Sequence, residues 1–266
     1  MKRLSVKNLS MKLGEKILLN RLNFTVEENK SLVIVGESGS GKTLLSKLLI
    51  GEKPDLAVIE GDVKIGEQSI FDYKEKDWER LRGRKITYIA QNPQRLFNEM
   101  QTIGAHGDEL IRGVLGVDKM ESRRRFIDAL REFNLEAPEK LVKEYPFELS
   151  GGMLQRVMIA MSMVLEPELL IADEPTSALD SCNAKRVVDF LNLCKKKGTQ
   201  LVVVTHSYSL VKELADKVLI MRRGDQIEFG DVEIVMTHPI TEYGRALIAP
   251  RLYKRYHSRK NEKKEV

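Results

Sequence analysis

The stretch GESGSGKT at residues 36–43 contains the residues whose types and spacing most clearly predict chemistry. It fits the phosphate-binding pattern G-x-x-x-x-G-K-[ST] at every fixed position. Its glycines permit turns that point backbone N–H groups at phosphate oxygens. The Lys42 ammonium can reach the terminal phosphates, and the Thr43 hydroxyl can ligate Mg²⁺. We therefore predict a nucleoside-triphosphate site with the contacts Gly36, Glu37, Ser38, Gly39, Ser40, Gly41, Lys42 and Thr43.

A pair of acidic residues follows an apolar run in LLIADEP at residues 169–175. A carboxylate at the end of a buried strand lies at the rim of a sheet, so Asp173 can hold Mg²⁺, largely through water. Glu174 is one position further, points elsewhere and can polarise an attacking water. An acidic pair after a strand can also simply cap the next helix. The phosphate-binding pattern in the same chain favours the catalytic interpretation.

Apolar runs and helical patterns alternate along the chain, which indicates a largely parallel sheet covered on both faces. Short strands are expected within residues 4–35, and a mainly helical stretch is expected at about 102–165. Further strands are expected at 85–90, 169–173, 201–206 and 217–221, with strand and turn residues at 64–73 and helices at 43–50 and near 183–197. The chemistry-bearing motifs thus fall where strands end and helices begin.

The composition is that of a folded globular protein, with 42% hydrophobic and 31% charged residues among 266. The apolar runs are too short to cross a bilayer, and the N-terminus has no apolar signal core, so a cytosolic or peripheral membrane location is expected. Cys182 and Cys194 form no metal or redox pattern and are expected to be reduced thiols. Much of the net charge of +5 lies in the tail at 251–266, which we interpret as a solvated terminus, with a lipid- or nucleic-acid-binding patch as the alternative.

A third motif, ELSGGMLQR at residues 148–156, lies between the two halves of the predicted site. Here the sequence resembles the ABC ATPase family, whose signature is LSGGQ followed closely by Gln-Arg. Met153 replaces the usual glutamine, a departure that is frequent among importers of peptides and nickel. A serine, two glycines and a helix N-terminus can form an anion-binding surface. The resemblance implies that Ser150, Gly151 and Gly152 meet the γ-phosphate bound by a partner subunit.

Further markers of this family occur in the expected order. Gln91 matches the Q-loop glutamine, which the resemblance implies senses Mg²⁺ and the transport channel. Asp180, in SALD, matches the D-loop near the dimer interface, and His206 matches the switch histidine that contacts the γ-phosphate. Leu13 stands where the family usually stacks an aromatic residue on adenine. An apolar contact can cover a base, but it lacks aromatic stacking of about 1–3 kcal/mol per base.

The resemblance covers about residues 3–250 and implies the P-loop NTPase fold of ABC ATPases: an α/β fold with a mainly parallel core sheet, an N-terminal antiparallel β subdomain and an inserted helical subdomain. We expect an ATP-binding domain at 1–250, its helical subdomain at about 92–165, and a basic tail at 251–266. Two such subunits are expected to sandwich two ATP molecules, so that binding closes the dimer and hydrolysis reopens it. The implied catalytic residues are Lys42, Gln91, Glu174 and His206, and the implied Mg²⁺ ligands are Thr43, Gln91 and Asp173.

The segment HPITEYGRALIAP at 238–250 resembles the peptide/nickel importer group of the family. That group implies a second, similar ATP-binding subunit, two permeases and an extracytoplasmic binding protein, with this chain on the cytoplasmic side of the cell membrane. The short tail resembles nickel or metallophore members, so uptake of nickel or a metal chelate is the first expectation. The alternative cargo is an oligopeptide or dipeptide. No nucleic-acid partner is expected.

Three other functions compete with this interpretation. A soluble ABC ATPase working on ribosomes or DNA usually has two cassettes or a long coiled coil, and this chain has neither. A P-loop kinase or recombinase gives no reason for the signature, Gln91 and His206 in this order. A protein that binds ATP without hydrolysing it would not need Glu174. Salt-dependent binding of nucleic acid by the pure protein would favour the first of these.

Overall fold

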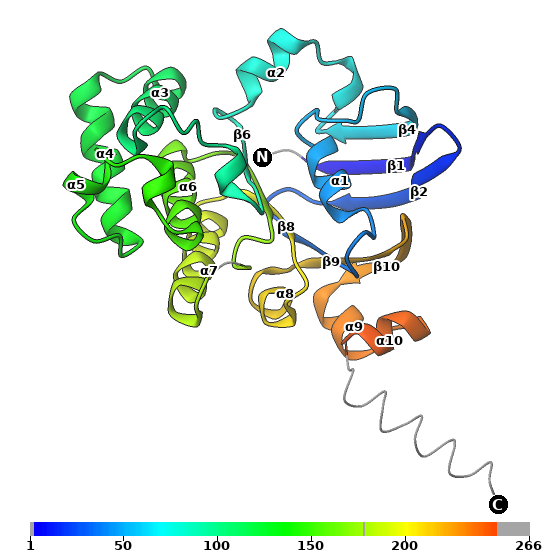
Figure 1. Cartoon of the computed structure of the whole chain (residues 1–266). Coiled ribbons are helices and arrows are strands. Elements are labelled where there is room, and N and C mark those ends of the chain that lie inside the picture. The colour runs from blue at the N-terminus through cyan, green and yellow to red at the C-terminus, as the bar shows by residue number, and fades with distance from the viewer. Residues whose placement is uncertain (1–2, 178, 249–266) are drawn as a thin grey trace, which may run out of the picture.

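A computed structural model describes residues 3–177 and 179–248, and its centre is one ten-stranded sheet (Figure 1). The strand order across the sheet is β5-β4-β1-β2-β10-β9-β3-β8-β7-β6. The strands are β1 (Leu4–Leu13), β2 (Lys16–Val26), β3 (Leu32–Val35), β4 (Val58–Ile65), β5 (Gln68–Ser69), β6 (Ile86–Ile89), β7 (Leu169–Asp173), β8 (Gln200–Val204), β9 (Lys217–Arg222) and β10 (Asp225–Asp231).

The helices enclose this sheet and extend to one side of it (Figure 1). They are α1 (Lys42–Leu48), α2 (Glu75–Leu81), α3 (Ile103–Leu115), α4 (Lys119–Glu132), α5 (Pro138–Leu141), α6 (Gly151–Leu165), α7 (Ser181–Lys196), α8 (Tyr208–Leu214), α9 (Val232–Thr237) and α10 (Glu242–Ile248). Short 3-10 turns are found at Ile70–Asp72, Pro93–Arg95 and Pro146–Glu148. The tail at 251–266, which we expect to be a basic terminus, lies outside the described residues.

Five strands form a core in which β6, β7, β8, β3 and β9 pair in parallel. Their side chains are almost all buried, as parallel strands covered on both faces require. Since parallel strands all end at the same edge, β3, β6, β7 and β8 deliver the following loops to one rim. The phosphate loop, Gln91, the Asp-Glu pair and His206 all follow these strands.

The N-terminal strands form an antiparallel layer, with β1 pairing both β2 and β4. This layer meets the core through β10, which pairs β2 in parallel at one position and β9 along its length in antiparallel orientation. The expected mainly parallel core and N-terminal antiparallel part are both present. The sequence did not predict β10, although it joins the two.

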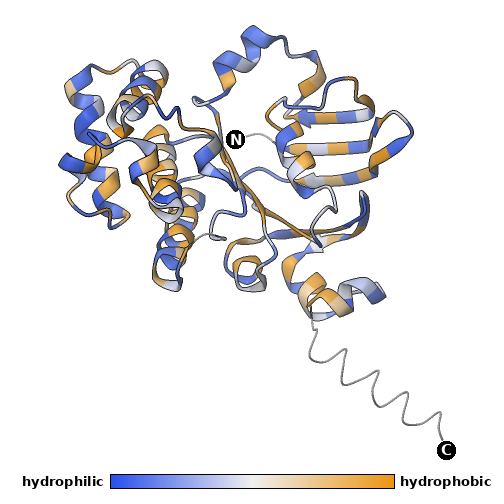
Figure 2. Ribbon diagram, in the orientation of Figure 1, coloured by the Kyte–Doolittle hydropathy of each residue, from blue (hydrophilic) through white to orange (hydrophobic). Residues whose placement is uncertain are grey.

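Four helices, α3 to α6, lie between β6 and β7 in the chain and stand beside the sheet (Figure 1). Apolar residues of these helices, such as Ile103 and Leu141, belong to one buried core cluster, while much of α4 and α5 is coloured hydrophilic (Figure 2). Phe126 is fully buried among them, and the core continues into the sheet through residues of α6 such as Val157 and Ile159. The helical part is therefore packed directly onto the strands that carry the rim.

Gly107 of α3 lies against the Phe126 ring of α4, and a Cβ added to it would lie 2.3 Å from that ring. Because the ring is fully buried, Gly107→Ala is expected to lower the free energy of unfolding by about 1–3 kcal/mol. Gly113, in the same helix, has no atom within 4 Å of the added Cβ. Gly113→Ala is expected to raise stability by roughly 0.5–1 kcal/mol. Urea unfolding of both variants measures this difference, and equal effects would contradict the close approach.

In the described part of the chain, no helix combines the length and apolar character needed to cross a bilayer.

Candidate functional site

A cavity of about 1020 Å³ opens at the rim where the core strands end. It brings together residues that are far apart in the sequence: the phosphate loop, the start of α1, the end of β7 and the residues after β6 and β8. Of the predicted site residues, it is lined by Gly36, Glu37, Ser38, Gly39, Gly41, Lys42, Thr43, Gln91, Asp173, Glu174 and His206. Ser40 is buried behind the loop, where its carbonyl accepts a hydrogen bond from the N–H of Gly224 at 3.0 Å.

The phosphate loop is held close to the sheet by its first glycine. A Cβ on Gly36 would lie 2.1 Å from the carbonyl oxygen of Met221 in β9, and the φ of Gly36 is 156°, so only glycine fits there. The Lys42 Nζ folds back over the loop and donates to the carbonyls of Gly36 and Glu37, both at 2.8 Å. Burial lowers the pKa of this lysine, while the nearby carboxylates of the Asp-Glu pair oppose that effect. The cation is therefore already placed at the centre of the loop.

Asp173 ends β7 and is 1% exposed. Its Oδ2 accepts a hydrogen bond from the Tyr88 hydroxyl of β6 at 3.2 Å, whereas its buried Oδ1 has no hydrogen-bond partner. Burial is the largest influence on the Asp173 pKa and raises it, while the Thr43 and Tyr88 hydroxyls lower it. A buried carboxylate oxygen with no partner is costly unless something binds it. A hydrated Mg²⁺ fits this oxygen and the neighbouring Thr43 hydroxyl.

Glu174 leaves the strand in a left-handed backbone conformation, with φ at 49°. Its N–H is held by the carbonyl of Val204 at 2.9 Å, which fixes the turn against β8. Glu174 Oε1 lies 2.9 Å from Nδ1 of His206, and the two side chains are 10% and 73% exposed. Strained backbone of this kind concentrates at functional positions. The turn places a shielded carboxylate and an exposed imidazole side by side at the cavity wall.

The structure does not support the alternative that Asp173 and Glu174 only cap a helix. The next helix is α7, and its capping residue is Asp180, whose Oδ1 accepts hydrogen bonds from the N–H groups of Cys182 and Asn183, both at 3.0 Å. Those bonds lower the Asp180 pKa, the one from Asn183 most strongly. Asp173 and Glu174 are instead directed to the cavity.

Ser150 stands at the N-terminus of α6, where its Oγ accepts a hydrogen bond from the N–H of Met153 at 3.3 Å. Neither Ser150, Gly151 and Gly152 nor Asp180 is among the described residues lining the phosphate cavity. Within one subunit the structure therefore does not bring the signature or Asp180 to the phosphate loop. Their expected role across a dimer remains a prediction.

The cavity also contains residues that sequence reasoning missed: Lys16, Ile17, Leu18, Leu44, Lys47, Val204, Arg223 and Leu247. Leu13, named as a possible base contact, is 41% exposed and is not among the described lining residues. It pairs with Lys16 across the β1–β2 turn, and the next two residues of β2 reach the cavity instead. Motif spacing locates the start of the hairpin but not which side of its turn faces the cavity.

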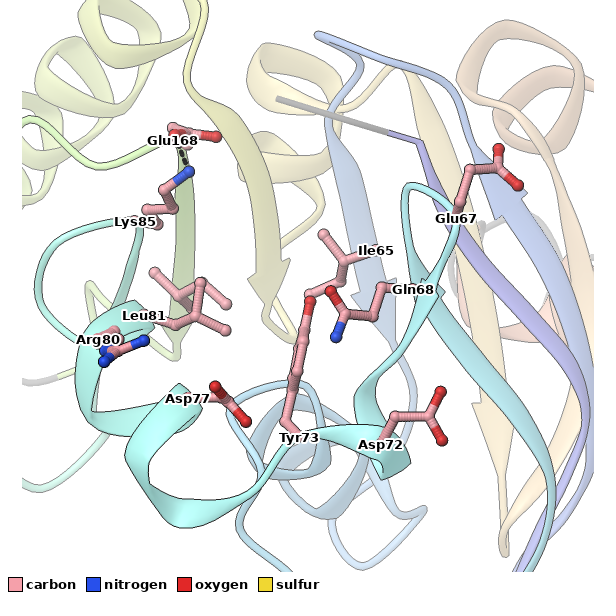
Figure 3. A pocket seen from close by; sticks show the side chains of 11 residues that line it. Ile65, Glu67, Gln68, Asp72, Tyr73, Asp77, Arg80, Leu81, Lys85 and Glu168 are labelled. Carbon is pink, nitrogen blue, oxygen red and sulfur yellow. Dashed lines mark ion pairs between the residues drawn. The ribbon is translucent and has the colours of Figure 1, made fainter.

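A second cavity of about 690 Å³ lies at the opposite ends of β6 and β7 (Figure 3). Lys85 precedes β6 and Glu168 precedes β7, and the two form an ion pair at 3.2 Å there. Tyr73 and Asp77 line its α2 side (Figure 3). It contains none of the predicted site residues.

Comparison with known proteins gives consistent results at the levels of sequence and fold. The family model described as ABC transporter matches residues 19–177. The metal-staphylopine import system ATP-binding protein of Staphylococcus aureus is 33% identical over 87% of this chain and 86% of its own length. The dipeptide transport ATP-binding protein of Escherichia coli is 35% identical over 92% of this chain and 77% of its own length. A dimeric ATP-binding cassette solved in a post-hydrolysis state with ADP and Pi superposes with a TM-score of 0.75 at 26% identity, covering 86% of this chain and 98% of that one.

Proposed function

The chain belongs to the ABC transporter family as the ATP-hydrolysing subunit of an importer, and we propose that its Mg²⁺-dependent hydrolysis drives uptake of nickel or a metal chelate. The observation that carries the site assignment is the single cavity in which Lys42, Asp173 and the Glu174–His206 pair meet. These groups can supply the positioning and charge neutralisation on which phosphoryl transfer mainly depends.

In the proposed mechanism, the loop N–H groups and Lys42 bind the phosphates, because the lysine already lies over the loop. Bound Mg²⁺ would neutralise charge on the terminal phosphates. Glu174 orients the attacking water and accepts its proton, and its shielded position favours this role over that of a solvated surface carboxylate. His206, exposed and hydrogen-bonded to Glu174, contacts the γ-phosphate. Gln91, two residues beyond the end of β6, lines the same cavity and would be a further contact to the Mg²⁺.

Tyr88 holds one oxygen of Asp173 and thereby orients the other, which has no partner, toward the metal position. Tyr88→Phe removes the hydroxyl and keeps the ring, so we expect the Mg²⁺ concentration for half-maximal turnover to rise about tenfold. Binding of Mn²⁺ to the protein–ATP complex, followed by electron paramagnetic resonance, gives a readout that is independent of turnover. Tyr73→Phe, at the second cavity, is the control; equal metal binding by both variants would contradict the role of Tyr88.

We further propose that the chain acts as one of two ATP-binding subunits, on the cytoplasmic face of the membrane, together with two permeases and an extracytoplasmic binding protein. The dimeric state of the matched cassette supports the pairing. The position of the signature supports it too, because Ser150 and its glycines lie outside the phosphate cavity of their own subunit. A heterodimer with a similar subunit is our proposal, as in the peptide/nickel group.

The cargo proposal rests on similarity, and the two cargo classes have almost equal identities to this chain, 33% and 35%. The match to the metal-staphylopine protein spans 86% of that protein, against 77% of the dipeptide protein, and this favours a metal chelate. The alternative cargo is an oligopeptide or dipeptide.

Cells carrying only Glu174→Gln test the cargo, with nickel accumulation and sensitivity to a toxic peptide as parallel readouts. Loss of nickel uptake alone is the expected result. Loss of peptide sensitivity alone would replace the metal cargo with a peptide. If neither readout changed, both cargo proposals would be wrong, while the assignment to the family would stand.

A further inference from the structure

The segment from Pro239 to Ile248 contains most of the motif that singled out the importer group, and the mechanism above leaves it without a role. It follows α9 and ends in α10, which lies below the β9–β10 hairpin (Figure 1). That hairpin runs past the phosphate loop, since the N–H of Gly224 bonds the carbonyl of Ser40. The segment is thus folded back to the nucleotide side of the sheet.

A buried carboxylate anchors the beginning of this segment. Glu228 of β10 is 8% exposed and accepts hydrogen bonds from the N–H of Ile240 at 2.9 Å and the Thr241 hydroxyl at 3.1 Å. Gly244 bonds the same threonine hydroxyl through its N–H at 3.0 Å. A Cβ on Gly244 would lie 2.7 Å from Glu228 Oε2 and 2.9 Å from Thr241 Oγ1, so a larger residue would displace these two hydrogen-bonding groups. The start of α10 therefore has one defined position on β10.

Tyr243 connects the anchored segment to the phosphate loop. Its hydroxyl oxygen accepts a hydrogen bond from the N–H of Glu37 at 3.4 Å, and the Arg222 guanidinium lies over its ring at 4.6 Å from the centroid. The carbonyl of the same Glu37 accepts the bond from Lys42 Nζ at 2.8 Å. Residue 37 therefore contacts Tyr243 through its N–H and the phosphate-binding lysine through its carbonyl.

Leu247 lies one turn further along α10 and lines the phosphate cavity. Two aliphatic side chains of β2, Ile17 and Leu18, also belong to that lining. Leu247, Ile17 and Leu18 all line the cavity and offer apolar surface to the nucleoside part of a bound nucleotide.

We propose that the segment from Pro239 to Ile248 is part of the nucleotide site: Tyr243 positions the phosphate loop, and Leu247 contacts the nucleoside. This rests on the site proposed above and adds two residues that act on affinity in different ways. A residue that shapes the loop changes the affinity for any polyphosphate. A residue that touches the nucleoside changes the affinity only for ligands that contain a nucleoside.

Isothermal titration of the purified full chain with Mg-ATP and with Mg-tripolyphosphate separates the two roles. Tyr243→Phe is expected to lower the affinity for both ligands by about three- to tenfold, because it removes one hydrogen bond and keeps the ring under Arg222. Leu247→Ala is expected to lower the affinity for ATP by a similar factor and to leave the affinity for tripolyphosphate unchanged. Tyr73→Phe, at the second cavity, and Ile234→Ala, on an exposed position of α9, are the matched controls.

Unchanged binding of both ligands by Tyr243→Phe would overturn the loop role, and equal weakening of both ligands by Leu247→Ala would overturn the nucleoside contact. Melting temperatures equal to wild type exclude a general loss of structure, and Leu247→Val replaces the alanine variant if that one does not fold. Lys42→Ala is measured alongside. If Lys42→Ala binds both ligands like wild type, the nucleotide site itself is misplaced. If Lys42→Ala loses affinity while Tyr243→Phe and Leu247→Ala do not, only this further inference fails.

Discussion

ATP turnover about 10²- to 10⁴-fold below wild type is the expected result for Glu174→Gln in the assembled transporter. The amide has nearly the same shape as the carboxylate, but it cannot accept the proton of the attacking water. Nucleotide affinity is expected to stay close to wild type, because the phosphate loop and Lys42 are unchanged. Phosphate release under saturating ATP, together with equilibrium binding, measures the two effects separately.

Glu168→Gln is the matched control, since Glu168 precedes the same strand and pairs with Lys85 at its far end. Its turnover is expected to equal that of wild type, because an exposed ion pair contributes little. Wild-type turnover by Glu174→Gln would remove this residue from the catalytic set, whatever the control shows.

Nucleotide affinity about 10- to 100-fold weaker is expected for Lys42→Ala, since hydrogen bonds to charged groups contribute about 1.5–3 kcal/mol each. The ammonium is buried in the loop and cannot be replaced by a surface cation. Binding of a fluorescent ATP analogue to the pure subunit gives the affinity.

Lys47→Ala provides the comparison for that experiment. Lys47 also lines the cavity, but it is half exposed and forms an ion pair with Glu52 at 3.4 Å. Its removal is expected to change affinity less than threefold, because solvent screens its charge. Similar losses in the two variants would show that net charge, not the position of Lys42 over the loop, sets affinity.

The parallel core and the place of each motif on it were predictable because both depend on local patterns. Four-residue apolar runs predict buried strands, and the fixed positions of the phosphate pattern place Lys42 where the loop meets the next helix. The carboxylate after the apolar run at 169–172 is likewise predicted to lie at the end of a strand. The structure brings Lys42, Asp173, Glu174 and His206 into one cavity, as these patterns indicate.

Contacts between distant segments were not predictable from the sequence. Tyr88 is an ordinary strand residue until β6 is paired with β7, which brings its hydroxyl to Asp173. Tyr243 contacts the phosphate loop from a segment whose preceding residues bond Glu228 of β10, a contact between parts of the chain that no local pattern reveals. Leu13 is not among the described residues lining the cavity, and sequence could not decide this, since the side of a hairpin that faces a cavity depends on the whole sheet.

The place of β9 and β10 in the sheet has a consequence for how the chain is made. They stand between β2 and β3, although among the described strands they leave the ribosome last. The N-terminal layer of β1, β2 and β4 can form early, but it cannot join the core until residues up to 231 have emerged. Pairings of such long sequence separation are slow to form. Until then β2 and β3 each present an unpaired strand edge, which makes nascent and truncated chains targets for chaperones or aggregation.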